Sequence, residues 1–359
     1  MATSEGTLNY TLRFPHHNFY RLLQEWHVSS LGIGTFVTEA YRDEHYAYSY
    51  KDAIKTALLS GANLIDTASN YRYGQSECDV GEALNELIAE EKISRDEVVI
   101  CSKGGFFSLS YPFPENPYTW IKENIIASGL AHESEIALDQ HCMTPAYLRW
   151  SLAQSLERLQ LESVDIFYLH NPETQLGFID YATFLSRLYA IFECFEQLAD
   201  EKKLTYYGIA VWNAFFYEKD NMESIQLEDC LRIAREVGGE NHRFRFIQVP
   251  YNLAKTHAYT QVTQEGYTLL EKAHALGLNV ITSSPFLQGH LFKAPLKPQM
   301  YHMTQTHTAY QAALQFARST PWVGATLFGS SSPEHVQSNL VLKDIEPMSV
   351  QVLHRLFGL

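Results

Sequence analysis

The sequence alternates between short apolar runs and longer segments with helical periodicity, and it does so eight times. Strictly alternating strands and helices predict a parallel sheet that is covered by helices. Eight such units at this spacing fit a closed barrel more economically than an open doubly wound sheet. We therefore expect a single-domain (β/α)8 barrel, an α/β fold of the TIM-barrel type. Its strands are expected at residues 29–34, 63–66, 98–103, 164–170, 204–211, 246–250, 279–283 and 322–327.

The barrel is expected to occupy residues 29–340, between a short N-terminal extension at 1–28 and a C-terminal helix or tail at 341–359. Within the extension, the alternating segment 8–14 is expected to form a short hairpin that closes one end of the barrel. The C-terminal segment has two interpretations, packing against the barrel or self-association. The sequence therefore leaves open whether the protein is a monomer or a homo-oligomer.

A long insertion interrupts the regular pattern after the third strand, at residues 104–143. A connection of this length inside a compact domain is usually a lid, a binding loop or a disordered segment. Its aromatic content favours an ordered structure, which we interpret as a wall of the substrate pocket. A packed surface flap is the alternative. The aromatic residues concerned are Phe106, Phe107, Tyr111, Phe113, Tyr118 and Trp120.

Charge and composition argue against several classes of partner. A net charge of -14, without a run of Lys and Arg, disfavours a nucleic-acid or anionic-membrane surface. No apolar run approaches the roughly 20 residues that a membrane-spanning helix needs. The 5 cysteines are scattered without paired spacing, which favours a reducing compartment. We expect a cytoplasmic protein without a metal site, in which His141 and Cys142 are a surface pair.

Three of the expected strands end in a residue that can hold or transfer a proton. Asp66 ends the second strand, Lys103 the third and His170 the fourth, and Tyr71 lies in the loop after Asp66. Active sites of (β/α)8 barrels lie at the C-terminal ends of the strands, so neighbouring strands would bring these residues together. A lysine paired with an aspartate lowers the pKa of a nearby phenol, and a neutral histidine can donate a hydrogen bond to a substrate oxygen. The sequence therefore predicts a proton donor directed at a carbonyl group.

These residues resemble the aldo-keto reductase family, NAD(P)H-dependent (β/α)8 barrels with a catalytic Asp, Tyr, Lys and His. The segment IDTASNYRYGQSE is similar to the family's IDTA-x-x-Y-G-x-G-x-S-E segment. CSKGG is similar to the family's lysine segment, and DIFYLHNPE to its histidine segment. The resemblance covers about residues 29–340. It implies that the catalytic residues are Asp66, Tyr71, Lys103 and His170.

One departure from the family pattern lies inside the tyrosine segment. Arg72 stands where the family usually has a glycine. Tyr71 and Tyr73 are consequently both candidates for the catalytic tyrosine. The spacing from Asp66 favours Tyr71.

The resemblance also implies a binding site for NADPH, with NADH as an alternative. The segment YGIAVWN is similar to the family's segment after the fifth strand. FIQVPYN is similar to the segment at the sixth strand, where a glutamine contacts the nicotinamide amide. LFGSSSPEHVQSN is similar to the segment that receives the adenosine phosphate. Serines replace the basic residues common at this phosphate site, and hydroxyls with backbone N–H groups can still hold a 2′-phosphate. The cofactor-binding residues implied are Gly34, Thr35, Asn171, Asn213, Gln248, Ser284, Phe286, Leu287, Gly289, Gly329, Ser330, Ser331, Ser332, His335 and Asn339.

The nicotinamide half of this site departs from the family at two further places. The Ser-Asn pair that holds the carboxamide in the family falls on Ala210 and Val211, whose side chains form no hydrogen bonds. Asn213 is the candidate substitute. The aromatic residue that stacks on the nicotinamide falls on Ser283, with Phe286 nearby.

The function implied is an NAD(P)H-dependent oxidoreductase that reversibly reduces an aldehyde or ketone to an alcohol. Its substrate would be a small carbonyl or sugar-like compound, with Tyr71 as general acid supported by Lys103, Asp66 and His170. The alternative is a cofactor-sensing regulatory subunit of the same fold with little or no turnover. A barrel glycosidase ranks third, because it needs two facing carboxylates and Asp165 lies at the wrong end of its strand.

Overall fold

Eight parallel strands close into a barrel in the order in which they occur along the chain. The protein is described by a computed structural model that covers residues 1–36, 49–109 and 113–357. Each strand lies at its expected position or within a few residues of it, so the prediction of a (β/α)8 barrel is confirmed. The barrel strands are β3 (Leu31–Gly34), β4 (Leu64–Asp66), β5 (Val99–Gly104), β8 (Val164–His170), β9 (Leu204–Ala210), β10 (Phe244–Pro250), β13 (Asn279–Ser283) and β14 (Val323–Gly329).

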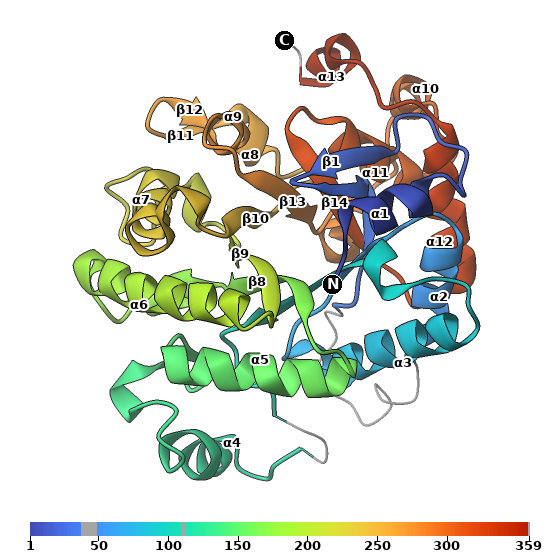
Figure 1. Cartoon of the computed structure of the whole chain (residues 1–359). Coiled ribbons are helices and arrows are strands. Elements are labelled where there is room, and N and C mark those ends of the chain that lie inside the picture. The colour runs from blue at the N-terminus through green and yellow to red at the C-terminus, as the bar shows by residue number, and fades with distance from the viewer. Residues whose placement is uncertain (37–48, 110–112, 358–359) are drawn as a thin grey trace.

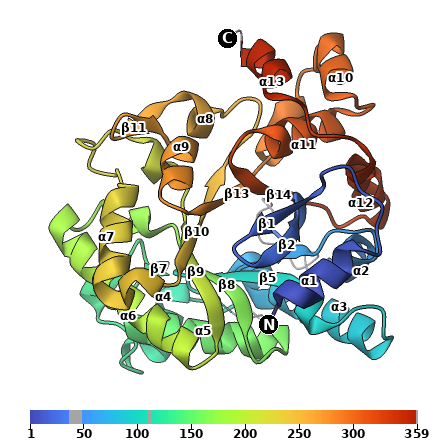
Figure 2. The same ribbon diagram turned by 45° about the horizontal axis from the view of Figure 1, so that its top comes forward.

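Helices surround the strands and form the outer layer of the fold (Figure 1, Figure 2). The start of one of them illustrates how the sequence sets their bounds. Thr144 accepts a hydrogen bond from the backbone N–H of Tyr147 (3.2 Å), and proline occupies the first helical position, where its missing N–H costs nothing. The helices that follow the barrel strands are α2 (Lys51–Leu59), α3 (Gln75–Ala89), α5 (Pro145–Leu159), α6 (Tyr181–Asp200), α7 (Leu227–Gly238), α9 (Leu269–Ala275), α11 (Ala309–Ser319) and α12 (Pro333–Leu340).

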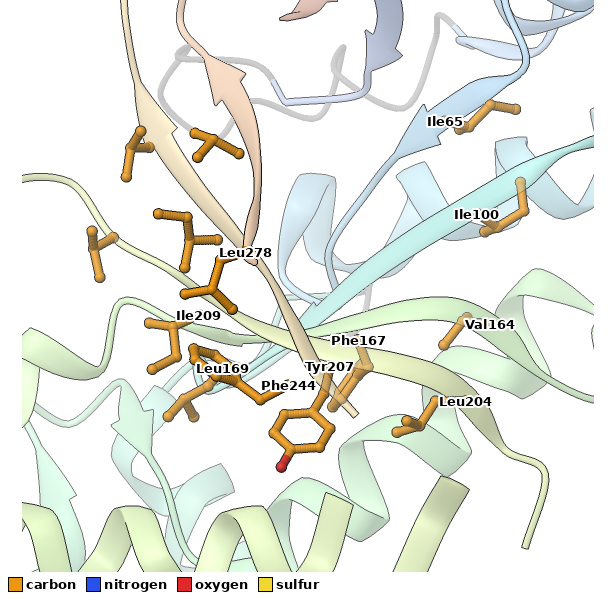
Figure 3. Close-up of a cluster of buried hydrophobic side chains, with 14 of the residues drawn as sticks. Ile65, Ile100, Val164, Phe167, Leu169, Leu204, Tyr207, Ile209, Phe244 and Leu278 are labelled. Carbon is orange, nitrogen blue, oxygen red and sulfur yellow. The ribbon is translucent and has the colours of Figure 1, made fainter. Parts of the chain in front are cut away.

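The core has two layers, because successive side chains of a strand point to opposite faces. On β8, Ile166 and Tyr168 belong to the cluster inside the barrel. Phe167 and Leu169 belong to the cluster between the strands and the helices. Figure 3 shows part of this outer cluster, with Phe167, Leu169 and Tyr207 directed away from the barrel axis.

The same alternation decides where the strand-end residues point. Each of Asp66, Lys103 and His170 follows an interior residue at a spacing of two, so each shares the inward face of its strand. Their side chains therefore project into the mouth of the barrel. The interior residues that set this direction are Leu64, Cys101 and Tyr168.

The N-terminal segment differs from its expected structure. Residues 8–14 do not form the predicted hairpin, because α1 (Ser4–Thr11) covers most of them. Thr3 accepts a hydrogen bond from the N–H of Gly6 (2.9 Å) and caps this helix, whose buried residues recur at helical spacing. A hairpin does close the bottom of the barrel, but it is formed by β1 (Tyr20–Leu23) and β2 (Trp26–Ser29). Trp26 of this hairpin belongs to the interior cluster.

The insertion after β5 contains α4 (Pro117–Ile121), a π-helical turn at Lys122–Ile126, and the paired strands β6 (Ile136–Ala137) and β7 (His141–Cys142). The expectation that His141 and Cys142 lie at the surface is wrong, since both are fully buried. A backbone hydrogen bond from the N–H of Cys142 to the carbonyl oxygen of Gly105 (2.8 Å) holds this strand against the end of β5. Nothing in the local pattern of apolar residues indicates this contact.

The C-terminal helix α13 (Val350–Phe357) packs against the outside of the barrel. The ring of Phe357 lies 5.5 Å from that of Tyr259 and 5.7 Å from that of Phe316. Among the described residues, no helix combines the length and apolar character that crossing a membrane requires. The remaining α-helices and strands are α8 (His257–Thr260), the paired strands β11 (Val262–Gln264) and β12 (Tyr267–Thr268), and α10 (Pro298–Thr304).

Candidate active site

A cavity of about 520 Å³ opens where the barrel strands end. Asp66, Tyr71 and His170 lie in its wall, and Lys103 is fully buried beside Asp66. The strands β4, β5 and β8, which supply or precede these residues, are neighbours in the barrel. The structure thus brings together the four residues that the sequence placed at one rim.

Lys103 and Asp66 form a buried ion pair at the base of this group. The Lys103 Nζ donates to Asp66 Oδ2 (2.5 Å) and to the carbonyl oxygen of Thr67 (2.9 Å). Gln248 Nε2 donates to the other Asp66 oxygen (2.8 Å). A buried ion pair is tolerated when additional hydrogen bonds satisfy both charges, and here each carboxylate oxygen has its own donor.

The charges of the pair follow from burial and from each other. Burial raises the pKa of Asp66, and the Lys103 ammonium and the Gln248 amide oppose this increase. Burial by itself would lower the pKa of Lys103, but Asp66 and Tyr71 outweigh it and raise that pKa. Lys103 therefore carries its proton at neutral pH.

Tyr71 is the phenol that lies next to this ammonium. The Lys103 Nζ is 4.8 Å from the centre of the Tyr71 ring. Burial raises the pKa of Tyr71, whereas Lys103 lowers it, so the hydroxyl is protonated at neutral pH and able to donate. Tyr73 is not among the described residues of the cavity wall, and its ring packs 5.0 Å from that of Phe113. Proximity thus favours Tyr71, as the spacing from Asp66 did.

The turn that carries Tyr71 has an unusual backbone. Arg72 and Tyr73 have φ angles of 49° and 56°, in the left-handed region that glycine adopts most easily. This explains why a glycine is the usual residue at the position of Arg72. Here the Arg72 guanidinium pairs with Asp79 at 2.6 Å in a buried position. The pair ties the turn to α3 and so helps to fix Tyr71.

His170 lies between two aromatic rings, those of Phe106 (5.0 Å) and Tyr71 (5.9 Å). Burial, and then the charges of Lys103 and His141, hold the pKa of His170 well below its usual range, so the imidazole is neutral. Its backbone oxygen accepts a hydrogen bond from His141 Nε2 (2.8 Å). Gly105 is needed beside it, since a Cβ there would lie 2.7 Å from that oxygen.

The cavity extends from these residues toward the start of α12, and most of the implied cofactor residues line it. Those in its wall are Gly34, Asn171, Gln248, Ser284, Phe286, Gly289, Gly329, Ser330 and Ser331. The other implied residues are outside the described wall: Thr35, Asn213, Leu287, Ser332, His335 and Asn339.

The end of the cavity near α12 has the features of an anion site. Ser332 Oγ accepts a hydrogen bond from the N–H of His335 (3.3 Å) and caps the helix. Ser330 and Ser331 precede this cap in the cavity wall. A helix N-terminus with adjacent hydroxyls can bind a phosphate through N–H and O–H donors.

The departures in the nicotinamide half are also visible. Ala210 and Val211 line the cavity and offer it no side-chain hydrogen bond. Asn213 Oδ1 accepts a hydrogen bond from Lys255 Nζ, so this amide is engaged outside the wall. Phe286 lines the cavity, with its ring 5.1 Å from that of Tyr310.

The aromatic residues of the insertion contribute to the cavity through Phe106. Phe107 packs against Tyr147 with ring centres 5.2 Å apart, and Trp120 packs against the outer core. The hydroxyl of Tyr118 donates to Glu133 (2.5 Å). Phe113 contacts Tyr73, as described above, and Tyr111 lies outside the described residues.

Sequence reasoning missed four aromatic residues of the described wall, Phe36, Tyr50, Trp212 and Phe328. The ring of Phe36 lies 5.1 Å from that of Tyr71. Trp212 lies in the loop after β9, within the segment YGIAVWN. Its position two residues after the strand end is the signal that was available for it.

Glu173, in the loop after β8, gives a pH-dependent prediction. It accepts the backbone N–H of Trp212 (2.7 Å), and burial raises its pKa from 4.5 to about 7. When the folded state raises the pKa of a carboxyl group, the protein loses folding stability as the pH rises from the group's pKa in the unfolded chain to its pKa in the folded one. Glu173→Gln keeps the acceptor and removes the charge. We expect this substitution to increase the free energy of unfolding by on the order of 1–3 kcal/mol above pH 7 and to leave it unchanged near pH 4.

Urea unfolding between pH 4 and pH 8 would measure this gain. Glu193→Gln, on the exposed face of α6, is the matched control and should change stability little at any pH. An equal gain in the free energy of unfolding for Glu173→Gln at pH 4 and pH 8 would contradict a raised pKa of Glu173 in the folded protein.

The chain is similar to several known proteins. A model of the Aldo/keto reductase family matches residues 30–356. The chain is 23% identical over 351 residues to a Schizosaccharomyces pombe protein named as a putative voltage-gated potassium channel subunit beta, covering 92% of this chain and 89% of that protein. It is 25% identical over 267 residues to probable aldo-keto reductase 1 of Glycine max, covering 74% of this chain and 58% of that protein.

Among solved structures, one of an aldo-keto reductase from Klebsiella pneumoniae in complex with NADPH is similar, with a TM-score of 0.62 and 21% sequence identity. The similarity covers 95% of this chain and 94% of that one. At this identity it bears on the fold.

Proposed function

Because the chain belongs to the aldo/keto reductase family, we propose that it is an NADPH-dependent oxidoreductase that reduces an aldehyde or ketone to an alcohol, and catalyses the reverse reaction. The observation that carries the proposal is the group formed by Asp66, Tyr71, Lys103 and His170 at one cavity. Asp66 is the only carboxylate among the described residues of the wall. Asp165 instead binds the backbone N–H of Ala2 (2.6 Å) near the N-terminus, which disfavours a glycosidase.

The described residues fit a dinucleotide. Gln248 lies in the cavity wall, where its side-chain amide donates to Asp66, and Ser330 and Ser331 lie in the wall near the start of α12. The solved relative from Klebsiella pneumoniae holds NADPH. Bound here, NADPH would supply the hydride that reduces the carbonyl carbon.

The protein's own residues would handle the proton. Tyr71 donates its hydroxyl proton to the carbonyl oxygen as charge develops there. Lys103 stabilises the phenolate that remains, and Asp66 keeps the Lys103 ammonium in place. Neutral His170 donates a hydrogen bond to the same carbonyl oxygen and orients it.

A regulatory subunit with slow turnover is the second candidate. The Schizosaccharomyces pombe relative, whose name is that of a channel subunit, favours it, as do the apolar side chains of Ala210 and Val211 where the family holds the carboxamide. Such a protein would bind the nucleotide tightly and turn over slowly or not at all. Aldehyde turnover by the nucleotide-bound protein therefore separates the two candidates.

Nucleotide titration tests the cofactor part of the proposal. We expect NADPH to bind with a Kd in the range of about 1 µM or tighter, and NADH more weakly, followed by nucleotide fluorescence. Ser331→Glu places a carboxylate beside the proposed phosphate site and should weaken NADPH binding by about tenfold or more, and NADH binding less. Gln337→Glu adds the same charge on an exposed part of α12 and is the control. Failure of the wild type to bind either nucleotide would overturn both candidate functions.

A further inference from the structure

Like Phe36, which is 44% exposed, Trp212 is a wall residue with a substantially exposed apolar ring. It lines the cavity with 40% of its surface accessible. The ladder between β8 and β9 pairs His170 with Ala210, so Trp212 lies just past the residue opposite His170. An exposed aromatic ring at a cavity wall is available for contact with a bound group.

Side chains from two other loops hold this residue in place. Glu173 accepts the backbone N–H of Trp212 (2.7 Å), and Lys255 Nζ donates to its carbonyl oxygen (2.9 Å). The amide of Asn171, in the orientation that satisfies both neighbours, donates to the carbonyl oxygen of Ala210 (3.1 Å) and accepts the indole N–H of Trp212 (3.2 Å). Both backbone polar groups and the indole N–H are thus occupied, which leaves the ring faces for contact with a ligand.

The side chains that pack around His170 and Tyr71 are largely aromatic. Phe106 and Tyr71 flank His170, and Phe36 packs on Tyr71. Among the described residues, the cavity wall contains no Lys or Arg, and Asp66 is already paired with Lys103. Around His170 the described wall therefore offers an anionic substrate no unpaired cationic side chain, whereas it offers a flat apolar group several ring faces.

We propose that Trp212 determines substrate specificity by stacking against the group attached to the carbonyl carbon, and that it selects uncharged carbonyl compounds whose group is flat and apolar, such as an aryl ring. The proposal rests on the function proposed above. Glu173 and Lys255 are positioning residues, because they bind the backbone of Trp212 and are not among the described residues of the cavity wall. A ring that is already fixed loses little conformational freedom on binding, which strengthens the contact.

Two pairs of compounds test this specificity. Benzaldehyde and cyclohexanecarbaldehyde have similar size, but only the first is flat; 4-carboxybenzaldehyde is flat but charged. We expect the wild-type kcat/KM to favour benzaldehyde over each of the others by about 3- to 10-fold. Trp212→Ala should abolish the preference for the flat ring, and Trp212→Phe should retain part of it. Trp322→Ala is the matched control, since Trp322 is 39% exposed and precedes β14 at the opposite end of the barrel.

A binding measurement keeps the test independent of turnover. Benzamide and cyclohexanecarboxamide are unreactive analogues whose binding to the NADP⁺-loaded protein, or to the protein alone if NADP⁺ does not bind, can be measured by calorimetry. Tighter binding of benzamide, lost in Trp212→Ala, supports the inference even when no aldehyde is reduced, in which case the reductase proposal alone fails. Equal or undetectable binding of the two amides, or a preference that persists in Trp212→Ala, would overturn it.

The positioning role has its own readout. Lys255→Met should raise the KM for benzaldehyde by about two- to threefold with little change in kcat, and Lys255→Arg should restore it, because an arginine can still donate to the Trp212 carbonyl. Equal losses in kcat and kcat/KM with no rescue by arginine would contradict a role through Trp212.

Discussion

Tyr71→Phe is expected to lower kcat for aldehyde reduction by a factor of about 10²–10⁴, because it removes the proton donor and leaves the ring in place. NADPH binding should change by no more than about twofold, since the lost hydroxyl acts on the carbonyl oxygen. Absorbance at the nicotinamide band follows the first quantity and nucleotide fluorescence the second. The expectation depends on the Lys103 ammonium, which lies 4.8 Å from the ring and stabilises the phenolate left after transfer.

Tyr73→Phe is the control for this experiment. The Tyr73 ring contacts Phe113 and is not part of the described cavity wall, so its hydroxyl should be dispensable for turnover. A large loss in Tyr73→Phe together with an active Tyr71→Phe would transfer the role to the second phenol, the alternative that the sequence alone left open.

Lys103→Met is expected to remove activity and to destabilise the fold by about 3–5 kcal/mol at pH 8, because it leaves a buried carboxylate without its counter-charge. Lys103 is fully buried and Asp66 is 3% exposed, so solvent cannot replace the lost partner. The loss of stability should shrink at pH 5. There the carboxyl, whose pKa burial raises, can take up a proton and escape the penalty.

A second substitution separates stability from chemistry. Adding Asp66→Asn to Lys103→Met removes the unpaired charge and should restore most of the free energy of unfolding, measured by urea denaturation, without restoring turnover. The Gln248 amide, which donates to Asp66 (2.8 Å) in the wild type, retains a side-chain oxygen to bind. A stable Lys103→Met variant, or an active double variant, would contradict the roles assigned to the pair.

The barrel itself was accessible from the sequence because strand parity and strand–helix alternation are local properties. β8 (Val164–His170) was predicted at its observed bounds, since a continuous apolar run that is buried on both faces has few other interpretations. The prediction for the N-terminal segment was wrong because its local pattern did not determine its structure. Residues 8–14 alternate like a strand, but the cap supplied by Thr3 and the buried spacing of Tyr10 and Thr11 make residues 8–11 helical.

The candidate site also contains residues that could be predicted from local sequence patterns and residues that could not. Asp66, Lys103 and His170 could be placed together because each ends a strand on the inward face, although their catalytic roles remain proposals. Trp212 could not be recognised as a fixed wall residue. Its place depends on Glu173 and Lys255, which come from other loops and meet it only in three dimensions.

Transfer of labelled hydride is the most direct test of the central claim. The protein would be incubated with benzaldehyde and with NADPH that is deuterated at both C4 positions of the nicotinamide, and the benzyl alcohol would be analysed by mass spectrometry. Our account predicts deuterium at the carbinol carbon with the wild type, and about 10²–10⁴ times less labelled product per unit time with Tyr71→Phe. Unlabelled alcohol, or no alcohol from a protein that binds NADPH tightly, would contradict a reductase and favour the regulatory subunit.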